Sequence, residues 1–434
     1  MNEYDISKAS EELGQNGDES PEIHYLPTSK QKYWKQDDRG QWIGYGVGEA
    51  RRYLSVGCQL KSDEVNEVLY NAENNKVLDI VTKIGGYKKG LHDIDGKRVL
   101  VPSEQRRINP AEGRWSTLEA VLLGMLGEEQ LEWYCGWVKH WMEGFYAYAD
   151  NAGQVLALVG PPSCGKSLLL DLQNYIVDSG KGGDPLRWIT GQTHFNGELC
   201  ECTHLMLDDK FQDLGLKGKK TLKMFIKEIA VAGSHRFEIK HQQAFNASPL
   251  WRMTLACNDD AESLSVIPEL EGNIQNKISL LNCTRCDMPM PSQTSSERSK
   301  FWSQLTKEMP AFLYHIMNEH EISEEMKDKE DRRMLVRGYH NPIATKLAEE
   351  SSYDGQRMSA IKECLRKVQQ IGHEWEGTPT ELLDILKAKG IERNASPTSI
   401  GKLLTNRSKL PVDQVTFQGN KNGKRTYLIN LREE

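Results

Sequence analysis

The most constraining feature of this 434-residue chain is a glycine-rich segment between an apolar strand and an apolar helix. The strand is expected over residues 155–159, and the helix is expected to begin just after residue 166. The segment fits G-x-x-x-x-G-K-[ST] in the strand–loop–helix context that this phosphate-binding pattern requires. It consists of Gly160, Pro161, Pro162, Ser163, Cys164, Gly165, Lys166 and Ser167. The sequence therefore predicts a nucleotide-binding site at this loop.

The residue types of the loop suit this chemistry. Gly160 and Gly165 let backbone amides converge on phosphate oxygens, and the start of the helix adds a partial positive charge. Lys166 is expected to bridge the β- and γ-phosphates, and the Ser167 hydroxyl is expected to bind Mg²⁺. No chemistry is assigned to Cys164. ATP and Mg²⁺ are the expected cofactors, since no Asn-Lys-x-Asp run for guanine follows the loop.

A second apolar run, residues 203–207, ends in an acidic pair about 40 residues after the loop. Asp208 is predicted to hold the metal through water, and Asp209 is predicted to orient or deprotonate the attacking water. Many strands end in acids, but this spacing after the loop makes the pair informative. The predicted metal site consists of Ser167 and Asp208.

Two further segments follow the acidic pair. Alternation over residues 235–240, a polar tip and a return strand predict a β-hairpin. It would project Lys240 and His241, which suits a nucleic-acid backbone. An ordinary surface hairpin is the alternative. Residues 251–257 then form an apolar strand that ends in Asn258. Asn258 is interpreted as a sensor of the γ-phosphate, and a simple turn residue is the alternative.

The order of GPPSCGKS, LMLDD, the basic hairpin and LACN resembles the superfamily 3 helicases, in particular phage and satellite primase-helicases and their poxvirus relatives. The resemblance is close over residues 155–285, and KIGGYKKG, RVLVPS and EWEGTPTELLDIL extend it. It implies a ring, usually a hexamer, with ATP between subunits and DNA in the centre. It also implies the catalytic set Asp208, Asp209 and Asn258, with Lys240 and His241 gripping DNA.

One family feature is absent from its usual place. Family members carry an arginine finger near residues 272–281, where this sequence has Lys277, and the next arginine is Arg285. A finger contributes on the order of 10³–10⁵ in rate, and lysine lacks its planar fork. Three possibilities stay open: Lys277 suffices, Arg285 substitutes, or another arginine such as Arg252 reaches across.

Composition divides the chain into five predicted regions. They are a flexible acidic tail (1–22), an N-terminal α+β module (23–115), a helical connector (116–150), the helicase ATPase domain (151–345), and a helical linker with a winged helix (346–434). A hairpin is expected between Trp34 and Trp42. Two connector helices follow, and the aromatic stripe of the second, which is dense in Trp and Tyr, is interpreted as core or interface. A later helical segment is expected to break near Pro310.

The winged helix is predicted from two capped helices and a terminal hairpin. Thr378 and Glu381 form a capping box, and Asn422-Gly423 predicts a tight turn. Cations at the hairpin tip suit a phosphate backbone, with docking of a protein partner as the alternative. They are Lys421, Lys424 and Arg425.

The fold class is thus α/β: an AAA+-like P-loop NTPase core, an N-terminal α+β and helical region, and a C-terminal winged helix. A net charge of −7 argues against a generally basic nucleic-acid coat, and no apolar run is long enough to span a membrane. The acidic start does not resemble a secretory signal, and nine scattered cysteines indicate reduced thiols, so the cytoplasm of a bacterial host is expected. No zinc-ribbon pair or primase centre is evident, so a separate chain would supply priming.

The sequence therefore predicts a replicative DNA helicase of a phage, plasmid or mobile element. The main alternative is a DNA-binding regulatory or loading ATPase that assembles on DNA without unwinding it. A small-molecule kinase with the same loop is disfavoured by the hairpin and the winged tail.

Overall fold

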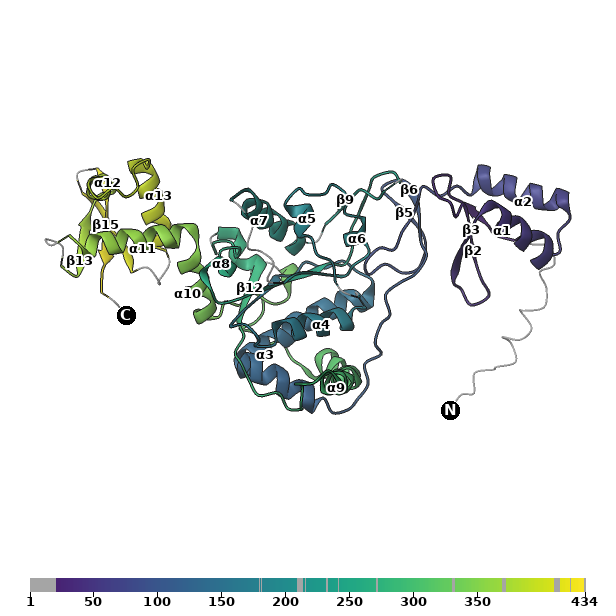
Figure 1. The fold of residues 1–434 in the computed structure, drawn as a ribbon, viewed down its shortest axis with the longest axis horizontal. Coiled ribbons are helices and arrows are strands. Elements are labelled where there is room, and N and C mark those ends of the chain that lie inside the picture. The colour runs from purple at the N-terminus through teal and green to yellow at the C-terminus, as the bar shows by residue number, and fades with distance from the viewer. Residues whose placement is uncertain are drawn as a thin grey trace.

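The structure is a computed structural model that describes residues 21–178, 180, 182–208, 214, 216–231, 233–240, 242–270, 272–329, 332–368, 372–409, 414–421 and 423–432. Asp209, His241 and Asn422 lie outside the described residues, as does almost all of the predicted acidic tail. Figure 1 shows three parts along the long axis: a small N-terminal part, a central part built on a sheet, and a C-terminal part at the other end.

The N-terminal part joins a three-stranded antiparallel sheet to two helices. Its elements are β1 (His24–Tyr25), β2 (Tyr33–Gln36), β3 (Trp42–Tyr45), α1 (Val47–Arg52), the π-helical turn η1 (Tyr53–Gly57) and α2 (Ser62–Asn75). β2 and β3 pair with Gln36 opposite Trp42, which confirms the predicted hairpin. This part has an apolar core of its own, which includes Tyr33, Leu54 and Leu69.

A second small sheet lies between this part and the central part. It consists of β4 (Ile80–Val81), β5 (Gly90–Ile94) and β6 (Lys97–Val101), in the order β4-β6-β5. The Gly85 amide donates to the Cys200 carbonyl at 2.7 Å, and the Gly85 carbonyl accepts from the Leu250 amide at 2.9 Å. Any side chain at Gly85 would collide with the Cys202 carbonyl, so this close approach requires glycine.

The central part is built on a four-stranded parallel sheet. Its strands are β7 (Val155–Val159), β8 (His204–Asp208), β11 (Arg252–Cys257) and β12 (Ile278–Asn282), in the order β12-β7-β11-β8. Parallel pairing brings the carboxyl ends of all four strands to one edge. The residues that follow neighbouring strands therefore meet there, which is where open α/β sheets bind ligands. The sheet confirms the predicted α/β class.

Helices cover both faces of this sheet (Figure 1). One face carries α3 (Ser116–Ala147), α4 (Lys166–Ile176) and α9 (Ser295–Tyr314). The other carries α5 (Leu186–Ile189), α6 (Gly197–Cys200), α7 (Leu216–Ala230), α8 (Ala261–Leu264) and α10 (Pro342–Ser351). Alternate residues of β7 face the two apolar clusters, which explains why the whole strand is apolar.

The remaining elements of the central part are short. The antiparallel pair β9 (His235–Phe237) and β10 (Phe245–Ala247) forms the hairpin that the sequence predicts. The helical turns are η3 (Gly272–Lys277), η4 (His315–Glu319) and η5 (Arg332–Met334). Among the described residues, no helix has both the length and the apolar character needed to cross a membrane.

The structure confirms the expectation for the long helix α3 and contradicts the expectation for α9. The aromatic side chains of α3 are core residues as predicted, since Trp137, Trp141 and Phe145 are buried, and Gly127 with φ of 74° marks the expected division of the helix. The expected break near Pro310 is wrong, because α9 continues through it. The flanking residues of α9 are buried against α3, and this packing outweighs the hydrogen bond that proline cannot donate.

The C-terminal part combines helices with a three-stranded antiparallel sheet. Its elements are α11 (Tyr353–Arg366), β13 (Glu374–Gly377), α12 (Pro379–Ala388), α13 (Pro397–Arg407), β14 (Val415–Lys421) and β15 (Lys424–Asn430), with strand order β13-β15-β14. Both bonds of the predicted capping box are present between Thr378 and Glu381. The strand β13 was not expected from the sequence.

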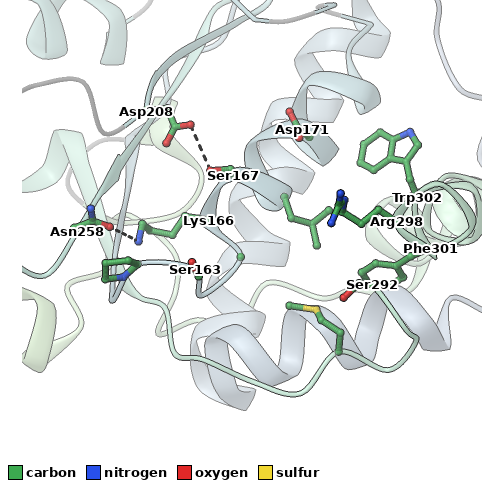
Figure 2. Close-up of a pocket in the computed structure, with 14 residues that line it drawn as sticks. Ser163, Lys166, Ser167, Asp171, Asp208, Asn258, Ser292, Arg298, Phe301 and Trp302 are labelled. Atoms are coloured by element: carbon green, nitrogen blue, oxygen red, sulfur yellow. Dashed lines mark hydrogen bonds between the residues drawn. The ribbon is translucent and has the colours of Figure 1, made fainter. Parts of the chain in front are cut away.

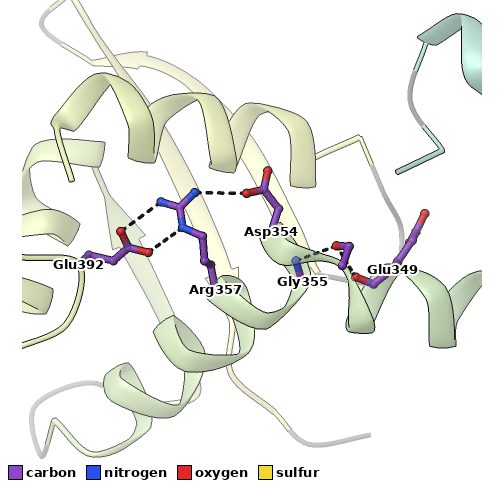
Figure 3. Close-up of polar contacts among 6 residues, drawn as sticks. Glu349, Asp354, Gly355, Arg357 and Glu392 are labelled. Carbon is purple, nitrogen blue, oxygen red and sulfur yellow. Dashed lines mark hydrogen bonds and ion pairs between the residues drawn. The ribbon is translucent and has the colours of Figure 1, made fainter. Parts of the chain in front are cut away.

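An ion-pair cluster ties α11 to the turn after α12 (Figure 3). The Arg357 guanidinium donates to the two carboxylate oxygens of Glu392 at 2.7 and 3.2 Å. It also donates to Asp354 at 3.2 Å. These bonds raise the pKa of Arg357 above its ordinary value. The cluster joins two segments of the C-terminal part that are distant in sequence.

Candidate functional site

The glycine-rich loop, Gly160–Ser167, connects β7 to α4 at the carboxyl edge of the sheet. Gly165 has φ of 99°, in the left-handed region that favours glycine, and a side chain there would also meet Met125. A side chain at Gly160 would collide with the Cys283 carbonyl. Both glycines of the pattern are therefore required by the backbone, which leaves the amides at the start of α4 facing the site.

Lys166 is folded back onto its own loop. Its ammonium donates to the carbonyls of Gly160 at 2.7 Å and Pro161 at 3.0 Å, and to the side-chain oxygen of Asn258 at 3.0 Å (Figure 2). Only 6% of Lys166 is exposed. The structure thus brings together two residues that are 92 positions apart in sequence. Asn258 lies directly after β11, which pairs with β7.

A pair of oxygen donors lies beside the lysine. The Ser167 hydroxyl donates to the Asp208 carboxylate at 3.4 Å (Figure 2). Asp171, one turn further along α4, has a raised pKa because of burial and the nearby negative charge of Asp208. Hydroxyl and carboxylate oxygens are donors that Mg²⁺ prefers, so Ser167 and Asp208 fit the predicted metal. Asp209 lies outside the described residues.

A pocket of about 690 Å³ opens beside the glycine-rich loop. Its polar end contains Lys166 and Ser167, and its other end is formed by the α9 residues Arg298, Phe301 and Trp302 (Figure 2). Trp302 packs edge-on against Tyr175 of α4, with ring centres 5.9 Å apart. No sequence pattern pointed to the α9 residues, because they reach the site only through packing of a helix from far along the chain.

The candidate finger residues lie in different places. Arg285 donates through Nε and Nη2 to the Pro162 carbonyl, at 3.1 and 3.0 Å, so it contacts the loop of its own chain. Lys277 precedes β12 and therefore lies at the amino edge of the sheet, away from the loop. Arg252 is buried, donates to Asn151, and has its pKa lowered to about 10 by burial. Arg252 therefore cannot reach a neighbouring copy.

The predicted hairpin carries a cation next to an exposed aromatic ring. The Lys240 ammonium lies 5.7 Å from the ring centre of Phe195, and 48% of Phe195 is exposed. Asn196 fixes this arrangement, because its side chain donates to the Arg236 carbonyl at 2.9 Å and accepts from the Glu238 amide at 2.8 Å. Phe195 was missed in the sequence because it lies in a loop outside the hairpin. His241 lies outside the described residues.

Three predicted cations lie together on the hairpin of the C-terminal part. Lys421 and Lys424 are partners in the register of β14 and β15, and Arg425 is the next residue along β15. All three are exposed. Lys421 forms an ion pair with Glu376, and Arg425 donates to Thr405 at 3.4 Å. Lys424 lies between them on the same hairpin end.

Comparison by sequence identifies no relative: no family model matches the chain, and no curated protein is significantly similar to it.

Comparison by structure identifies proteins of similar fold. Two apo structures in the A form of the NrS-1 C-terminal region have TM-scores of 0.54 and 0.53, at 14% and 12% identity. A further apo structure of the same region has a TM-score of 0.55 at 13% identity. The matches cover 94–98% of this chain and 96–98% of the others. At this identity the likeness shows a shared fold over nearly the whole chain.

Proposed function

We propose that this chain is a ring-forming, ATP-dependent replicative DNA helicase of a phage, plasmid or mobile element. In this proposal the central part is an AAA+-like P-loop NTPase core of the superfamily 3 type, and the C-terminal part is a winged helix. One observation carries the proposal: Lys166, Ser167, Asp208 and Asn258 meet at one edge of the parallel sheet, beside a pocket of nucleotide size.

The two ends of the pocket suit the two ends of a nucleotide. The amides that begin α4 and the Lys166 ammonium bind phosphate oxygens. Lys166 exchanges its bonds to the loop carbonyls for bonds to the β- and γ-phosphates. At the other end, Phe301 and Trp302 offer aromatic surface for the base, and Arg298 is placed for a polar contact with the sugar or phosphate.

The residues for hydrolysis are grouped around the polar end. Mg²⁺ supplies positive charge that offsets the developing charge on the phosphates. Ser167 and Asp208 hold it, Asp209 is the proposed base for the attacking water, and Asn258 orients the γ-phosphate group. The Asn258 contact with Lys166 supports this assignment, because it places both side chains within one hydrogen bond of each other.

DNA is the proposed partner, bound single-stranded or as a fork. Lys240 and Phe195 offer a cation for phosphate and a ring for base stacking, which is the combination that binds single strands. His241 is proposed as the second hairpin contact. Lys421, Lys424 and Arg425 would contact the backbone of a duplex at the winged helix.

Assembly into a homo-oligomer, proposed as a hexamer, would place the nucleotide between subunits. Lys277 lies at a distance from the loop of its own chain, so it can serve only a neighbouring copy. Arg285 lies on the loop of its own chain and would act there in cis. Priming would come from a separate primase.

A second candidate is a DNA-binding regulatory or loading ATPase that assembles on DNA and never unwinds it. The position of Arg285 favours this alternative, because an arginine that contacts its own loop is not projected toward a neighbour. Both candidates share the nucleotide site and differ in translocation.

The test measures ATP hydrolysis with and without single-stranded DNA, and unwinding of a forked duplex. We expect hydrolysis that needs Mg²⁺, is stimulated by DNA and is abolished in Lys166→Ala. Lys389→Ala, a change at an exposed lysine of the C-terminal part, should behave as wild type.

The outcomes separate the two candidates. Unwinding that requires Lys166 supports the helicase. If DNA stimulates ATP hydrolysis but no forked duplex is unwound, the helicase is excluded and the loading ATPase is supported. Absence of nucleotide binding would contradict both.

A further inference from the structure

Three cysteines gather at the glycine-rich loop. Cys164 lies in the loop, and Cys283 follows β12 directly, where its amide donates to the Val159 carbonyl at 2.6 Å. Cys286 lies close to this pair and is partly exposed. All nine cysteines of the chain are free thiols in the structure. The backbone of β12 and the start of the loop are therefore in direct contact where two of the thiols meet.

The two buried thiols face each other and differ in character. The Cys283 thiol donates a hydrogen bond to the Cys164 sulfur, and the Lys166 ammonium lies 3.7 Å from the same sulfur. The hydrogen bond from Cys283 and the charge of Lys166 lower the pKa of Cys164, whereas the same contact and burial raise the pKa of Cys283. The surroundings therefore favour the thiolate at Cys164 and the thiol at Cys283, the pairing found at cysteines that oxidise reversibly.

Both cysteines of this pair are buried. Cys164 and Cys283 are 1% and 0% exposed. The residues on either side of Cys164, namely Ser163 and Gly165, line the pocket beside the loop. Cys164 itself does not line the pocket, because its side chain packs into the apolar cluster under the loop. A small oxidant such as hydrogen peroxide would therefore reach its sulfur only when the loop moves.

We propose that Cys164 is a site of reversible oxidation by a hydroperoxide, with Cys283 as the resolving thiol, and that the resulting disulfide turns off nucleotide binding. The consequence for binding rests on the proposed function, whereas the modification itself does not.

The reaction balances as two steps. The Cys164 thiolate attacks one peroxide oxygen, the O–O bond breaks, and Cys164 becomes a sulfenic acid while hydroxide leaves and takes up a proton. The Cys283 thiol then attacks the Cys164 sulfur, the S–S bond forms, the S–O bond breaks, and water leaves. Two thiols lose two electrons, and the peroxide is reduced to two waters.

The disulfide would act on the loop and on Lys166 together. A covalent link from the middle of the loop to the end of β12 would fix the loop in one arrangement. It would also remove the thiolate that lies against the Lys166 ammonium. Because the loop must adapt its amides to a triphosphate, we expect the affinity for ATP to fall at least tenfold.

The experiment uses the full chain, first reduced and then treated with hydrogen peroxide. Peptide mapping without reduction should identify a Cys164–Cys283 link, and a fluorescent ATP analogue should bind at least tenfold more weakly until dithiothreitol restores the affinity. Nucleotide binding by the reduced protein is measured first. If the reduced protein does not bind nucleotide, the proposed function is rejected. Peptide mapping would still show whether the Cys164–Cys283 disulfide forms.

Two variants make the test specific. Cys286→Ala removes the partly exposed neighbour and should still form the link and lose affinity. Cys283→Ala and Cys283→Ser should bind ATP normally when reduced and form no disulfide. Agreement between the two variants would show that the result comes from loss of the thiol and not from altered packing. The proposal is overturned if peroxide oxidises Cys286 while Cys164 and Cys283 remain unlinked, or if the linked protein binds ATP as well as the reduced protein.

Discussion

At the scale of single residues, the site depends on where polar side chains lie relative to strand ends. Asp208 is the last residue of β8, and Asn258 directly follows β11. Lys166 begins α4, at the end of the loop that follows β7. Neighbouring parallel strands therefore bring them within hydrogen-bond reach. The contact between Lys166 and Asn258 is the clearest result, because it converts a weak sequence signal at Asn258 into a specific pairing.

The variant Asn258→Ala should lower kcat for ATP hydrolysis by at least tenfold and change KM little. The reason is that a group aimed at developing charge acts in the transition state more than in the ground state, and loss of one such group costs about 10²–10³ in rate in other enzymes. Steady-state hydrolysis is the measurement. Asn246→Ala is the matched control, since Asn246 pairs with Asp95 away from the site. Equal losses in both variants would contradict the role of Asn258.

Buried histidines should make the stability of the central part depend on pH. His204 bonds Asn174 and Thr254, and burial lowers its pKa to about 3, while burial lowers the pKa of His140 to about 4. In the unfolded chain both would bind protons below about 6.5. As pH falls from about 6.5 to 4, the unfolded state therefore takes up more protons than the folded state. The free energy of unfolding then decreases by about 1.4 kcal/mol per pH unit for each of the two histidines.

Several acids oppose this trend, because burial raises the pKa of Glu143, Asp150, Asp171 and Glu201. Burial raises the pKa of Asp150 from its ordinary value of 3.8 to about 6. The stability that protonated Asp150 contributes to the folded state is therefore lost as pH rises from 3.8 to about 6.

Burial also lowers the pKa of His235, His320 and His340. Because these histidines, together with His140 and His204, outnumber the opposing acids, the thermal unfolding midpoint should fall between pH 7 and pH 5. His204→Gln should make the fall shallower, and His194→Gln, at an exposed histidine, should leave it unchanged. An identical pH dependence in wild type and His204→Gln would refute the assignment.

At the scale of elements, local signals predicted what local interactions determine. The glycine-rich loop, the hairpin between β9 and β10, and the capping box at Thr378 all follow from residues within a few positions of one another. The contribution of α9 to the pocket, the strand β13 and the continuity through Pro310 depend on packing between distant segments. Those features could not be read from the sequence, because nothing in a helix shows which surface it will contact.

The Lys240–Phe195 pair should contribute to binding of single-stranded DNA through two separable interactions, base stacking on Phe195 and a phosphate contact by Lys240. Phe195→Ala should weaken binding about tenfold at every salt concentration, since stacking is worth about 1–3 kcal/mol per base. Lys240→Ala should instead reduce the dependence of log K on log salt by about 0.7, the value for one phosphate contact on a single strand. Fluorescence anisotropy with an oligonucleotide measures both.

Tyr70→Ala, at a highly exposed aromatic residue on α2, is the control for loss of surface area. A salt dependence that is unchanged in Lys240→Ala would exclude a phosphate contact at the hairpin. Equal affinity of Phe195→Ala and wild type would exclude stacking.

The ion-pair cluster of Figure 3 should stabilise the C-terminal part. Arg357→Ala leaves the carboxylates of Glu392 and Asp354, which are 16% and 19% exposed, without their cation, and should cost about 2 kcal/mol. Hydrogen exchange of the α11 amides in the full chain should become at least tenfold faster. Lys367→Ala, which removes an exposed pair with Glu363, should leave exchange unchanged. Similar exchange in the two variants would show that the cluster contributes nothing.

At the scale of the whole molecule, charge and chemistry are distributed unevenly. The chain carries a net charge of −7, yet three exposed cations lie together on the β14–β15 hairpin, and the β9–β10 hairpin carries the exposed Lys240. The proposed nucleotide site lies at one edge of the sheet, and Lys277, one of the candidate finger residues, lies at the opposite edge. A single copy therefore does not assemble every residue of the proposed machine, which makes assembly the central claim.

The mass of the protein in solution, measured with and without Mg-ATP and single-stranded DNA, tests that claim most directly. We predict a hexamer that forms when ATP and DNA are present and fails to form in Lys166→Ala. A protein that stays a single copy under all conditions, while it hydrolyses ATP at a rate that DNA does not change, would contradict the account.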